Sequence, residues 1–459
     1  MFIIQYVVNL GASVMLPIVI FIIGLCLRQG VGKSLRSGLT IGVGFVGIGM
    51  VINLLTGNLG PAAKAMAENF GLGLSVIDLG WPGTSPMAWA SNMGMIAIPI
   101  AIAVNIIMLL LRMTKVVNVD IWNIWHMAFT GAIVELATGS FWWGIVGIVI
   151  HAAIAYKLGD MFAPVTDNFF GLEGIAIPHG TSAYMGIFAA PIDDLLAKIP
   201  GINKINITSQ KIEDRFGALG QPVIVGALLG FIIGLLARYP IGKSLQLAVQ
   251  MAAVMLLMPA VVKFIMEGLI PISEAARTML DKHFKNADFR IGLDPALLLG
   301  NQQVISASLI FIPLTILIAM FVPGNRVLPF GDLATIGFFI AIAVGVHKGN
   351  LFRTIISGSV IIFITIWISN QMVALQTRLA SATHLLKGNA VSSLDQSGSP
   401  ITFLLSRGFS LNITLGFFVI GILFVFCFAY TYMKYKRGTL YKEETHSSDV
   451  QNDGGFVEN

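Results

Sequence analysis

The sequence predicts an all-α membrane protein with about eleven transmembrane helices, built as an inverted repeat of two five-helix units plus one final helix, with re-entrant hairpins. The first observation is composition: of 459 residues, 56% are hydrophobic and 11% are charged, whereas a soluble chain carries roughly 25% charged residues. The second is a series of long apolar segments, and the third is an internal sequence repeat. So much apolar surface requires lipid as part of its solvent.

The apolar segments define the expected spans, because a crossing helix needs about 20 mostly apolar residues. These spans are 9–27, 37–55, 93–112, 123–138, 142–157, 219–237, 245–266, 302–322, 332–347, 354–374 and 411–433. Further apolar stretches, at 71–90, 171–191, 291–300 and 395–406, are too short or too interrupted by Gly and Pro to cross. Irregular backbone at membrane depth is tolerated only inside protein or beside a water-filled cavity, so we expect these stretches to be re-entrant.

The repeat is visible in two strings. Residues 21–35 read FIIGLCLRQGVGKSL, and residues 231–245 read FIIGLLARYPIGKSL. Further along, Asp120 corresponds to Asp332. Because each unit holds an odd number of spans, the second copy enters the membrane from the opposite side, as in many alternating-access carriers. Such carriers bind substrate near the bilayer midplane, where broken helices of both halves meet.

Lysine and arginine positions predict the orientation. Most of the 28 such residues lie on the cytoplasmic side if the N-terminus faces out and the C-terminus faces in. The net charge of +5 reflects these loops and does not indicate a nucleic-acid partner. The expected division is a first membrane repeat over 1–158, a re-entrant hairpin with a cytoplasmic loop over 159–215, a second inverted repeat over 216–408, a final transmembrane helix over 409–434 and a disordered cytoplasmic tail over 435–459.

Polar side chains in and beside the broken stretches are the candidate substrate contacts, because ionisable groups at membrane depth are costly and usually line a pathway. The candidates are Asp78, Trp81, His126, Thr130, Glu173, His179, Asp294, Asn301, Gln302 and Asp332. Carboxylates and amides suit the several hydroxyls of a polyol, and Trp81 could stack on its carbon skeleton. The broken stretches from 73–86, 171–184, 292–303 and 393–402 contain no arginine, which disfavours an anionic ligand.

Structural interpretations stand beside these functional ones. Asp120 and Asp332 precede apolar runs and could cap helices. His151 could be a packed histidine, and His347 an interfacial one. For Glu173 with His179 the pattern favours function. No Walker loop, metal-ligand spacing or nucleophile motif is present, so no catalytic residue, metal or cofactor is expected.

Several strings together resemble one transporter family. DLGWPGTSPMAWAS, NVDIWNIWHMAFTGA, GLEGIAIPHGTSAYMG, LPFGDLATIGFF and GSPITFLL resemble the galactitol permeases, which are IIC membrane components of bacterial phosphoenolpyruvate-dependent sugar phosphotransferase systems, in the ascorbate–galactitol branch. The resemblance covers about residues 10–430. It implies a permease of the bacterial inner membrane that imports a sugar or polyol and hands it to a cytoplasmic IIB protein, itself phosphorylated by IIA.

The resemblance also implies details of assembly and site. Cys26 and Cys427 lie in spans, so this chain is expected to be a transport subunit and not the phosphoryl carrier or an enzyme. The related ascorbate carrier is a homodimer with a fixed scaffold and a mobile core. His126 and His179 align with ligand-contacting histidines, Thr130 with a nearby polar contact and Asp294 with an acidic one. Gly180 replaces a polar ligand residue of the ascorbate carrier.

One departure from the galactitol pattern bears on the substrate. At residues 301–303 the chain has Asn-Gln-Gln where that pattern has His-Thr-Ala, so the polyol could differ from galactitol. The leading hypothesis is an elevator-type carrier coupled to phosphorylation. The alternatives are a proton-coupled secondary polyol transporter, with Glu173 or Asp78 as the proton site, and a scaffold or receptor that transports nothing.

Overall fold

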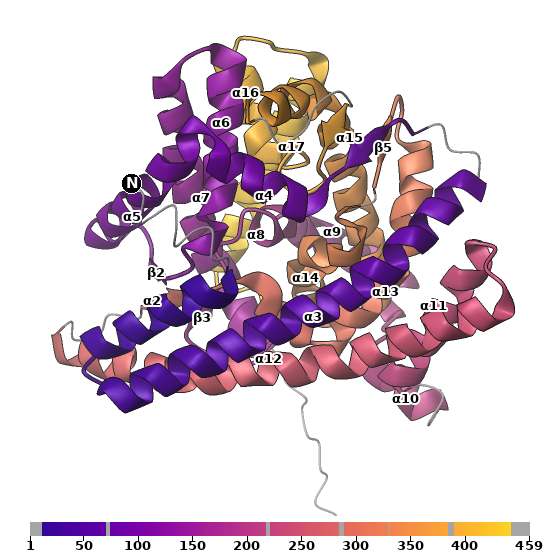
Figure 1. Ribbon diagram of the computed structural model, residues 1–459, viewed down its shortest axis with the longest axis horizontal. Helices are drawn as coiled ribbons and strands as arrows, with labels where there is room; N and C mark the ends of the chain where they lie inside the picture. Colours follow the sequence, from indigo (N-terminus) through magenta and orange to yellow (C-terminus); the bar gives the residue numbers. More distant parts are fainter. Residues whose placement is uncertain are drawn as a thin grey trace, which may run out of the picture.

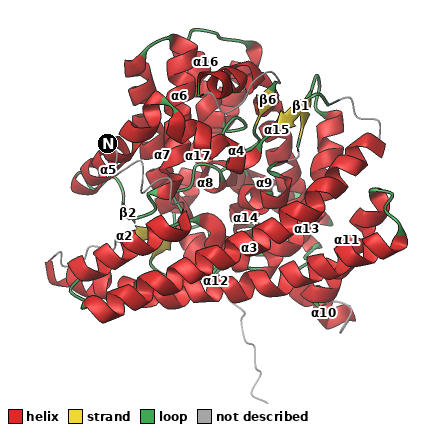
Figure 2. Cartoon of the chain, in the orientation of Figure 1, coloured by secondary structure: helices red, strands yellow, loops and turns green. Residues whose placement is uncertain are grey.

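The computed structural model describes residues 12–69, 74–216, 221–283, 289–329, 331–383 and 390–441. Helices dominate, and the strands are two or three residues long (Figure 2). Within these ranges, six helices are long and apolar enough to cross a membrane, and shorter apolar helices lie at Pro17–Cys26, Gly226–Leu236, Ile241–Leu257 and Gly337–Val346. The chain is therefore an all-α membrane protein. Most of the expected cytoplasmic tail, from residue 442 onward, lies outside the described residues.

Two long helical hairpins form one layer of the molecule. They are α2 (Ala12–Cys26) with α3 (Val31–Asn69), and α11 (Pro222–Leu236) with α12 (Ile241–His283). The helices α3 and α12 pack along each other across the lower part of Figure 1. The repeated strings form the turns of these hairpins, and Arg28 and Arg238 adopt left-handed φ values of 61° and 55°.

Helix packing explains why the same Gly and Ser occur in both strings, as Gly24 with Ser34 and as Gly234 with Ser244. A Cβ atom at Gly24 would lie 2.6 Å from Ser34 Oγ, and one at Gly234 would lie 2.8 Å from Ser244 Oγ. Both serines are fully buried. A glycine is therefore needed where the two helices of each hairpin approach most closely.

The remaining elements follow one order in each half. The first half contains β1 (Val76–Asp78), α4 (Gly80–Ala90), α5 (Asn92–Leu110), β2 (Val116–Asn118), η1 (Trp122–Ile124), α6 (Trp125–Thr138), α7 (Phe141–Asn168), β3 (Ile175–Ala176) and α8 (Ser182–Gly186). The second contains β4 (Arg290–Gly292), η4 (Pro295–Gly300), α13 (Gln302–Phe321), β5 (Val327–Leu328), η5 (Leu333–Thr335), α14 (Gly337–Val346), α15 (Leu351–Ala382), β6 (Val391–Ser392) and α16 (Pro400–Phe409). Between them lie α9 (Ala189–Lys198), η2 (Ile202–Lys204) and α10 (Ser209–Phe216), and α17 (Leu415–Lys436) follows.

The helix α7 continues to Asn168, past residue 158, where the sequence placed the end of the first unit. The broken stretches at 71–90, 171–191 and 291–300 each contain a short strand followed by a short helix, and the stretch at 395–406 follows β6 and includes α16. Gly- and Pro-rich sequence thus interrupts the helices at these places.

The short strands form two parallel sheets that lie apart from each other (Figure 2). In the β1 sheet, with strand order β5-β1-β6, Ile77 pairs with Leu328 and Val391. In the β4 sheet, with order β2-β4-β3, Ile291 pairs with Val117 and Ile175. Each central strand comes from one half and both outer strands come from the other. The two halves are therefore interlocked at both sheets.

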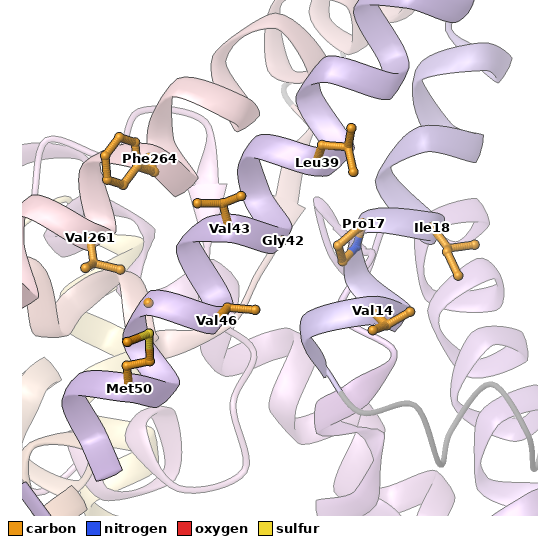
Figure 3. Close-up of a pocket in the computed structure, with 11 residues that line it drawn as sticks. Val14, Pro17, Ile18, Leu39, Gly42, Val43, Val46, Met50, Val261 and Phe264 are labelled. Carbon is orange, nitrogen blue, oxygen red and sulfur yellow. The ribbon is translucent and has the colours of Figure 1, made fainter. Parts of the chain in front are cut away.

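An apolar hollow of about 590 Å³ opens between α2, α3 and α12 (Figure 3). All of its lining residues are apolar, and two of them, Val43 and Met50, are 61% and 68% exposed. A ligand rich in hydroxyls would find no side-chain hydrogen-bond partner there. The hollow is a surface suited to lipid chains.

Candidate functional site

Asp78 is buried and is the last residue of β1. It stabilises the end of the β1 sheet where β1 leads into α4, which we call the β1 tip. Its Oδ1 accepts hydrogen bonds from the backbone N–H groups of Gly80, at 2.9 Å, and Leu394, at 3.1 Å. Its Oδ2 accepts from the N–H of Asp332, at 2.9 Å. One carboxylate therefore ties together three segments that are far apart in the sequence.

Asp332 completes this tip from the second half. Its Oδ1 accepts from the N–H of Trp81, at 2.9 Å, and its Oδ2 accepts from the N–H of Asp395, at 2.8 Å, and the hydroxyl of Ser393, at 3.1 Å. Asp332 thus caps α4 of the other half and makes no side-chain cap to its own helix η5. Both carboxylates of this tip are used mainly to satisfy backbone groups.

The tip of the β4 sheet contains the corresponding carboxylates, Asp120 and Asp294, in a different arrangement. The side-chain amide of Asn123 bridges them, donating to Asp120 Oδ2 at 2.6 Å and to Asp294 Oδ2 at 2.7 Å. Asp294 also accepts from the N–H of Ala296, at 2.7 Å, and it is only partly buried. The backbone carbonyl of Asn123 accepts from His126 Nδ1, at 2.9 Å.

Two histidines beside this tip have fixed tautomers. Because a carbonyl only accepts, Nδ1 of His126 carries hydrogen, and in the neutral ring Nε2 is an acceptor. In His179, Nδ1 accepts from the N–H groups of Thr181, at 3.3 Å, and Ser182, at 3.2 Å, so Nε2 carries the hydrogen. The rings meet edge to face with centroids 4.3 Å apart. A hydrogen-bond acceptor and a donor therefore lie side by side.

Unsatisfied polar atoms gather around these rings. Among the described residues, the buried side-chain atoms in this region without a hydrogen-bond partner are His126 Nε2, His151 Nε2, Ser182 Oγ, Gln396 Oε1 and Ser399 Oγ. We call this group the polar cluster. Leaving a buried polar group unpaired costs about 1–3 kcal/mol, so such a concentration requires an explanation, and a ligand that supplies the missing partners is the simplest one.

Contacts between the two halves bring the polar cluster together. A Cβ atom at Gly180 would lie 2.7 Å from His126 Cβ and 3.0 Å from His151 Nε2, so glycine permits this close approach. Thr130 Oγ1 lies 2.7 Å from His151 Nδ1 and 2.7 Å from Thr402 Oγ1. These two hydrogen bonds link α7, α6 and α16, and the second of them joins the first half to the second half.

Asp395 connects the polar cluster with the β1 tip. Its Oδ1 accepts from the hydroxyl of Thr181 and from Gln396 Nε2, at 3.0 Å, and lies 3.7 Å from His126 Nε2. Its backbone N–H donates to Asp332. Asp395 is therefore hydrogen-bonded to the β1 tip and lies close to His126 of the polar cluster.

The structure places one of the candidate residues in the polar cluster, two directly beside it and the others around it. His126 belongs to the cluster, Thr130 contacts His151, and His179 packs against His126; all three candidates are buried. Asp294 is linked to His126 through Asn123. Asp78, Trp81 and Asp332 lie at the β1 tip. Asn301 accepts from the N–H of Gln303, at 2.9 Å, to begin α13, while Glu173 and Gln302 are exposed.

Other polar residues of this region are not among the candidate substrate contacts. His151 was interpreted as a packed histidine, and Asn123 was overlooked, although an amide three residues before a histidine at a helix start was a usable signal. Ser182, Gln396 and Ser399 lie in the broken stretches. Within the described ranges, no group of three or more His, Cys, Asp or Glu side chains is arranged to hold a metal ion.

Comparison with known proteins shows the family to which the chain belongs. Residues 6–389 match the family described as the PTS system sugar-specific permease component. The chain is 60% identical over 422 residues to the PTS system galactitol-specific EIIC component of Escherichia coli (strain K12), covering 92% of this chain and 94% of that protein. The same values hold for the protein of that description from Escherichia coli O157:H7. A putative permease IIC component of strain K12 is 40% identical over 376 residues, covering 82% of this chain and 86% of that protein.

Proposed function

Because this chain belongs to the sugar-specific permease components of the phosphotransferase system, we propose that it carries galactitol across the inner membrane to a cytoplasmic IIB protein, which phosphorylates it. The chain is a transport subunit of that system. The observation that carries the substrate assignment is the polar cluster, in which neutral donors and acceptors from both halves lack partners.

The chemistry of the polar cluster suits a polyol. Gln396 Oε1 only accepts hydrogen bonds, His126 Nε2 accepts when the ring is neutral, His179 Nε2 donates, and the hydroxyls of Ser182 and Ser399 do either. Each polyol hydroxyl both donates and accepts, so one linear chain of hydroxyls can satisfy all of them. None of these side chains is a lysine or arginine that would pair with an anionic sugar phosphate.

The Asn-Gln-Gln sequence at residues 301–303, which differs from the galactitol pattern, does not argue against galactitol as the substrate. Asn301 is occupied in capping α13, Gln302 is exposed, and Gln303 Oε1 accepts from the N–H of Ser209, at 2.7 Å. These side chains are engaged outside the polar cluster. The 60% identity to a galactitol-specific component supports the same choice.

The proposed mechanism is an elevator in an inverted repeat. The exchange of central and outer strands between the two sheets supports the repeat, as do the matching turns at Arg28 and Arg238. In this proposal α2, α3, α11 and α12 form the scaffold of a homodimer, and the remaining helices form the core that moves. The N-terminus faces out and the C-terminus faces in.

Phosphorylation makes uptake irreversible in this scheme. The phosphoryl group leaves the IIB cysteine sulfur, a phosphorus–oxygen bond forms at a galactitol hydroxyl, and the hydroxyl proton is released. The product carries about −1.5 to −2 charges. A polar cluster without cationic side chains has no partner for that charge, so the product does not return.

The test is uptake of labelled galactitol into membrane vesicles that contain the permease. With phosphoenolpyruvate and the complete set of phosphotransferase proteins inside, galactitol phosphate should accumulate, and without IIB it should not. Accumulation of unmodified galactitol in the absence of IIB, abolished by a protonophore, would contradict the proposal.

A further inference from the structure

The loop between the two halves forms an exposed strip that the substrate site does not use. Leu195 on α9 is 60% exposed, Ile199 directly after α9 is 36% exposed, and Ile207 beyond η2 is 42% exposed. Lys198, Lys204 and Lys211 are also exposed. We call these six residues the basic strip. Leu195 and Lys198 share one face of α9, because residues three apart are neighbours on a helix, and Ile199 follows directly as the extended C-cap residue.

Contacts with α17 place the strip on the polar side of the membrane surface. The apolar exposed face of α17 continues to Met433, and Lys434 and Lys436 lie in its last turn. Thr431 Oγ1 donates to the carbonyl of Ile187, at 3.1 Å, and Lys434 Nζ lies 2.7 Å from Asp194. Asp194 on α9 therefore lies beside the last turn of α17, and the basic strip comes directly after Asp194 in the sequence. Its apolar side chains are exposed where lipid does not cover them.

The carboxylates of α9 are engaged internally, which leaves the strip with positive charge. Asp193 lies 2.8 Å from His347 and 2.9 Å from Arg353. Burial raises the pKa of Asp193, but the hydrogen bonds from His347 and Arg353 outweigh this and hold it below its usual value, so the carboxylate is ionised at neutral pH. Asp194 pairs with Lys434.

The strip is fixed to the core and continuous with the polar cluster. Asn350 Nδ2 donates to the carbonyl of Ile205, at 2.8 Å, and the N–H of Leu351 donates to Ile207, at 2.7 Å. Upstream, α9 follows α8 directly, and α8 begins at Ser182 of the polar cluster. A surface held in this way loses little conformational entropy when a partner binds.

We propose that the basic strip is the docking surface for the phosphorylated IIB protein. Its lysines face the anionic surface around the phosphoryl group, and Leu195, Ile199 and Ile207 supply the apolar centre of the contact. The proposal rests on the proposed function, which requires an anionic soluble partner at the cytoplasmic face. Opposite charges speed the encounter of such partners, and charges at the rim of an interface set its salt dependence.

The test varies the IIB concentration in a galactitol phosphorylation assay with permease in membranes of fixed lipid composition. In the triple variant Lys198→Glu, Lys204→Glu and Lys211→Glu, the apparent KM for IIB should rise at least about tenfold. The galactitol Kd, measured by calorimetry, should stay within about twofold of the unsubstituted protein. The milder triple change of the same lysines to Gln should raise the KM less, and it guards against misfolding.

The matched control reverses exposed charges away from the strip, with Lys243→Glu and Arg326→Glu, and should leave the KM for IIB unchanged. Added salt should raise the KM of the unsubstituted protein toward that of the triple variant. An unchanged KM for IIB in both triple variants would overturn the docking surface, and a dependence of their folded yield on anionic lipid alone would assign the strip to the membrane. Absence of galactitol phosphorylation by the unsubstituted protein would instead refute the proposed function.

Discussion

The two sheet tips use the same sequence pattern, a short strand followed by an aspartate, for different purposes. At the β1 tip, Asp78 and Asp332 are buried and accept almost entirely from backbone N–H groups. At the β4 tip, Asp120 and Asp294 share the side chain of Asn123, whose carbonyl orients His126.

This difference separates a structural junction from the proposed binding site. The carboxylates of the β1 tip have their hydrogen-bonding capacity used by the fold. At the β4 tip the hydrogen bonds end on His126 Nε2, which has no hydrogen-bond partner among the described residues and lies 3.7 Å from Asp395 Oδ1. Changes at the β1 tip should therefore affect folding first, and changes at the β4 tip should affect binding first.

The largest effect is expected for Asp78→Ala. The substitution leaves three backbone N–H groups without their acceptor, at a cost of about 1–3 kcal/mol for each group that stays buried and unpaired. We expect little folded protein, measured as the monodisperse fraction in detergent and its unfolding temperature. Asp294→Ala is the matched control and should lower stability less. A stable Asp78→Ala variant would remove the distinction between the tips.

The next effect is expected for His126→Ala, which removes an acceptor of the polar cluster. Loss of this contact should weaken galactitol binding about tenfold or more, corresponding to about 1.4 kcal/mol, with a smaller drop in unfolding temperature than Asp78→Ala causes. Calorimetry on the purified protein measures the first quantity and thermal unfolding the second. His126→Gln, which keeps an acceptor oxygen, should recover part of the affinity. Equal affinity in the alanine variant would exclude His126 from the site.

A sharper test of the β4 tip is Asn123→Asp. This change removes the amide that donates to both carboxylates and adds a third acidic group, so His126 should lose its orientation. Galactitol affinity should fall about tenfold at neutral pH and partly recover as the pH is lowered, because a protonated carboxyl can donate again. If Asn123 had only a structural role, the galactitol affinity of the folded Asn123→Asp protein would not recover at lower pH.

The smallest effect is expected for Arg290→Lys. Arg290 binds both oxygens of Asp167, with both distances at 2.7 Å, and holds β4 against the end of α7. The pair is partly exposed, so its loss should cost about 1 kcal/mol or less. The unfolding temperature should fall slightly while the galactitol Kd stays constant. A large loss of binding would show that the β4 sheet itself tunes the site.

The apolar pattern predicted much of the fold. Helices occupy every expected span in the described residues, and the interrupted stretches contain or adjoin the short strands and helices. The strands themselves could not be predicted, because two or three apolar residues carry no period that separates strand from helix. Their pairing depends on contacts between the two halves.

The site was predicted less completely for a related reason. His126 lies in the polar cluster, and Thr130 and His179 lie directly beside it, but whether an aspartate binds backbone or ligand depends on tertiary partners. Asp78 has the same local pattern as Asp294 and a different role. Glu173 lies in a Gly-rich break near His179, yet the structure leaves it exposed in the turn before β3.

The most direct measurement is a cryo-electron microscopy map of the purified permease with galactitol bound. The account predicts density for the polyol at the polar cluster, within hydrogen-bond distance of His126 Nε2, His179 Nε2 and the hydroxyls of Ser182 and Ser399. Density at the β1 tip against Asp78 and Asp332, with the polar cluster empty, would contradict it.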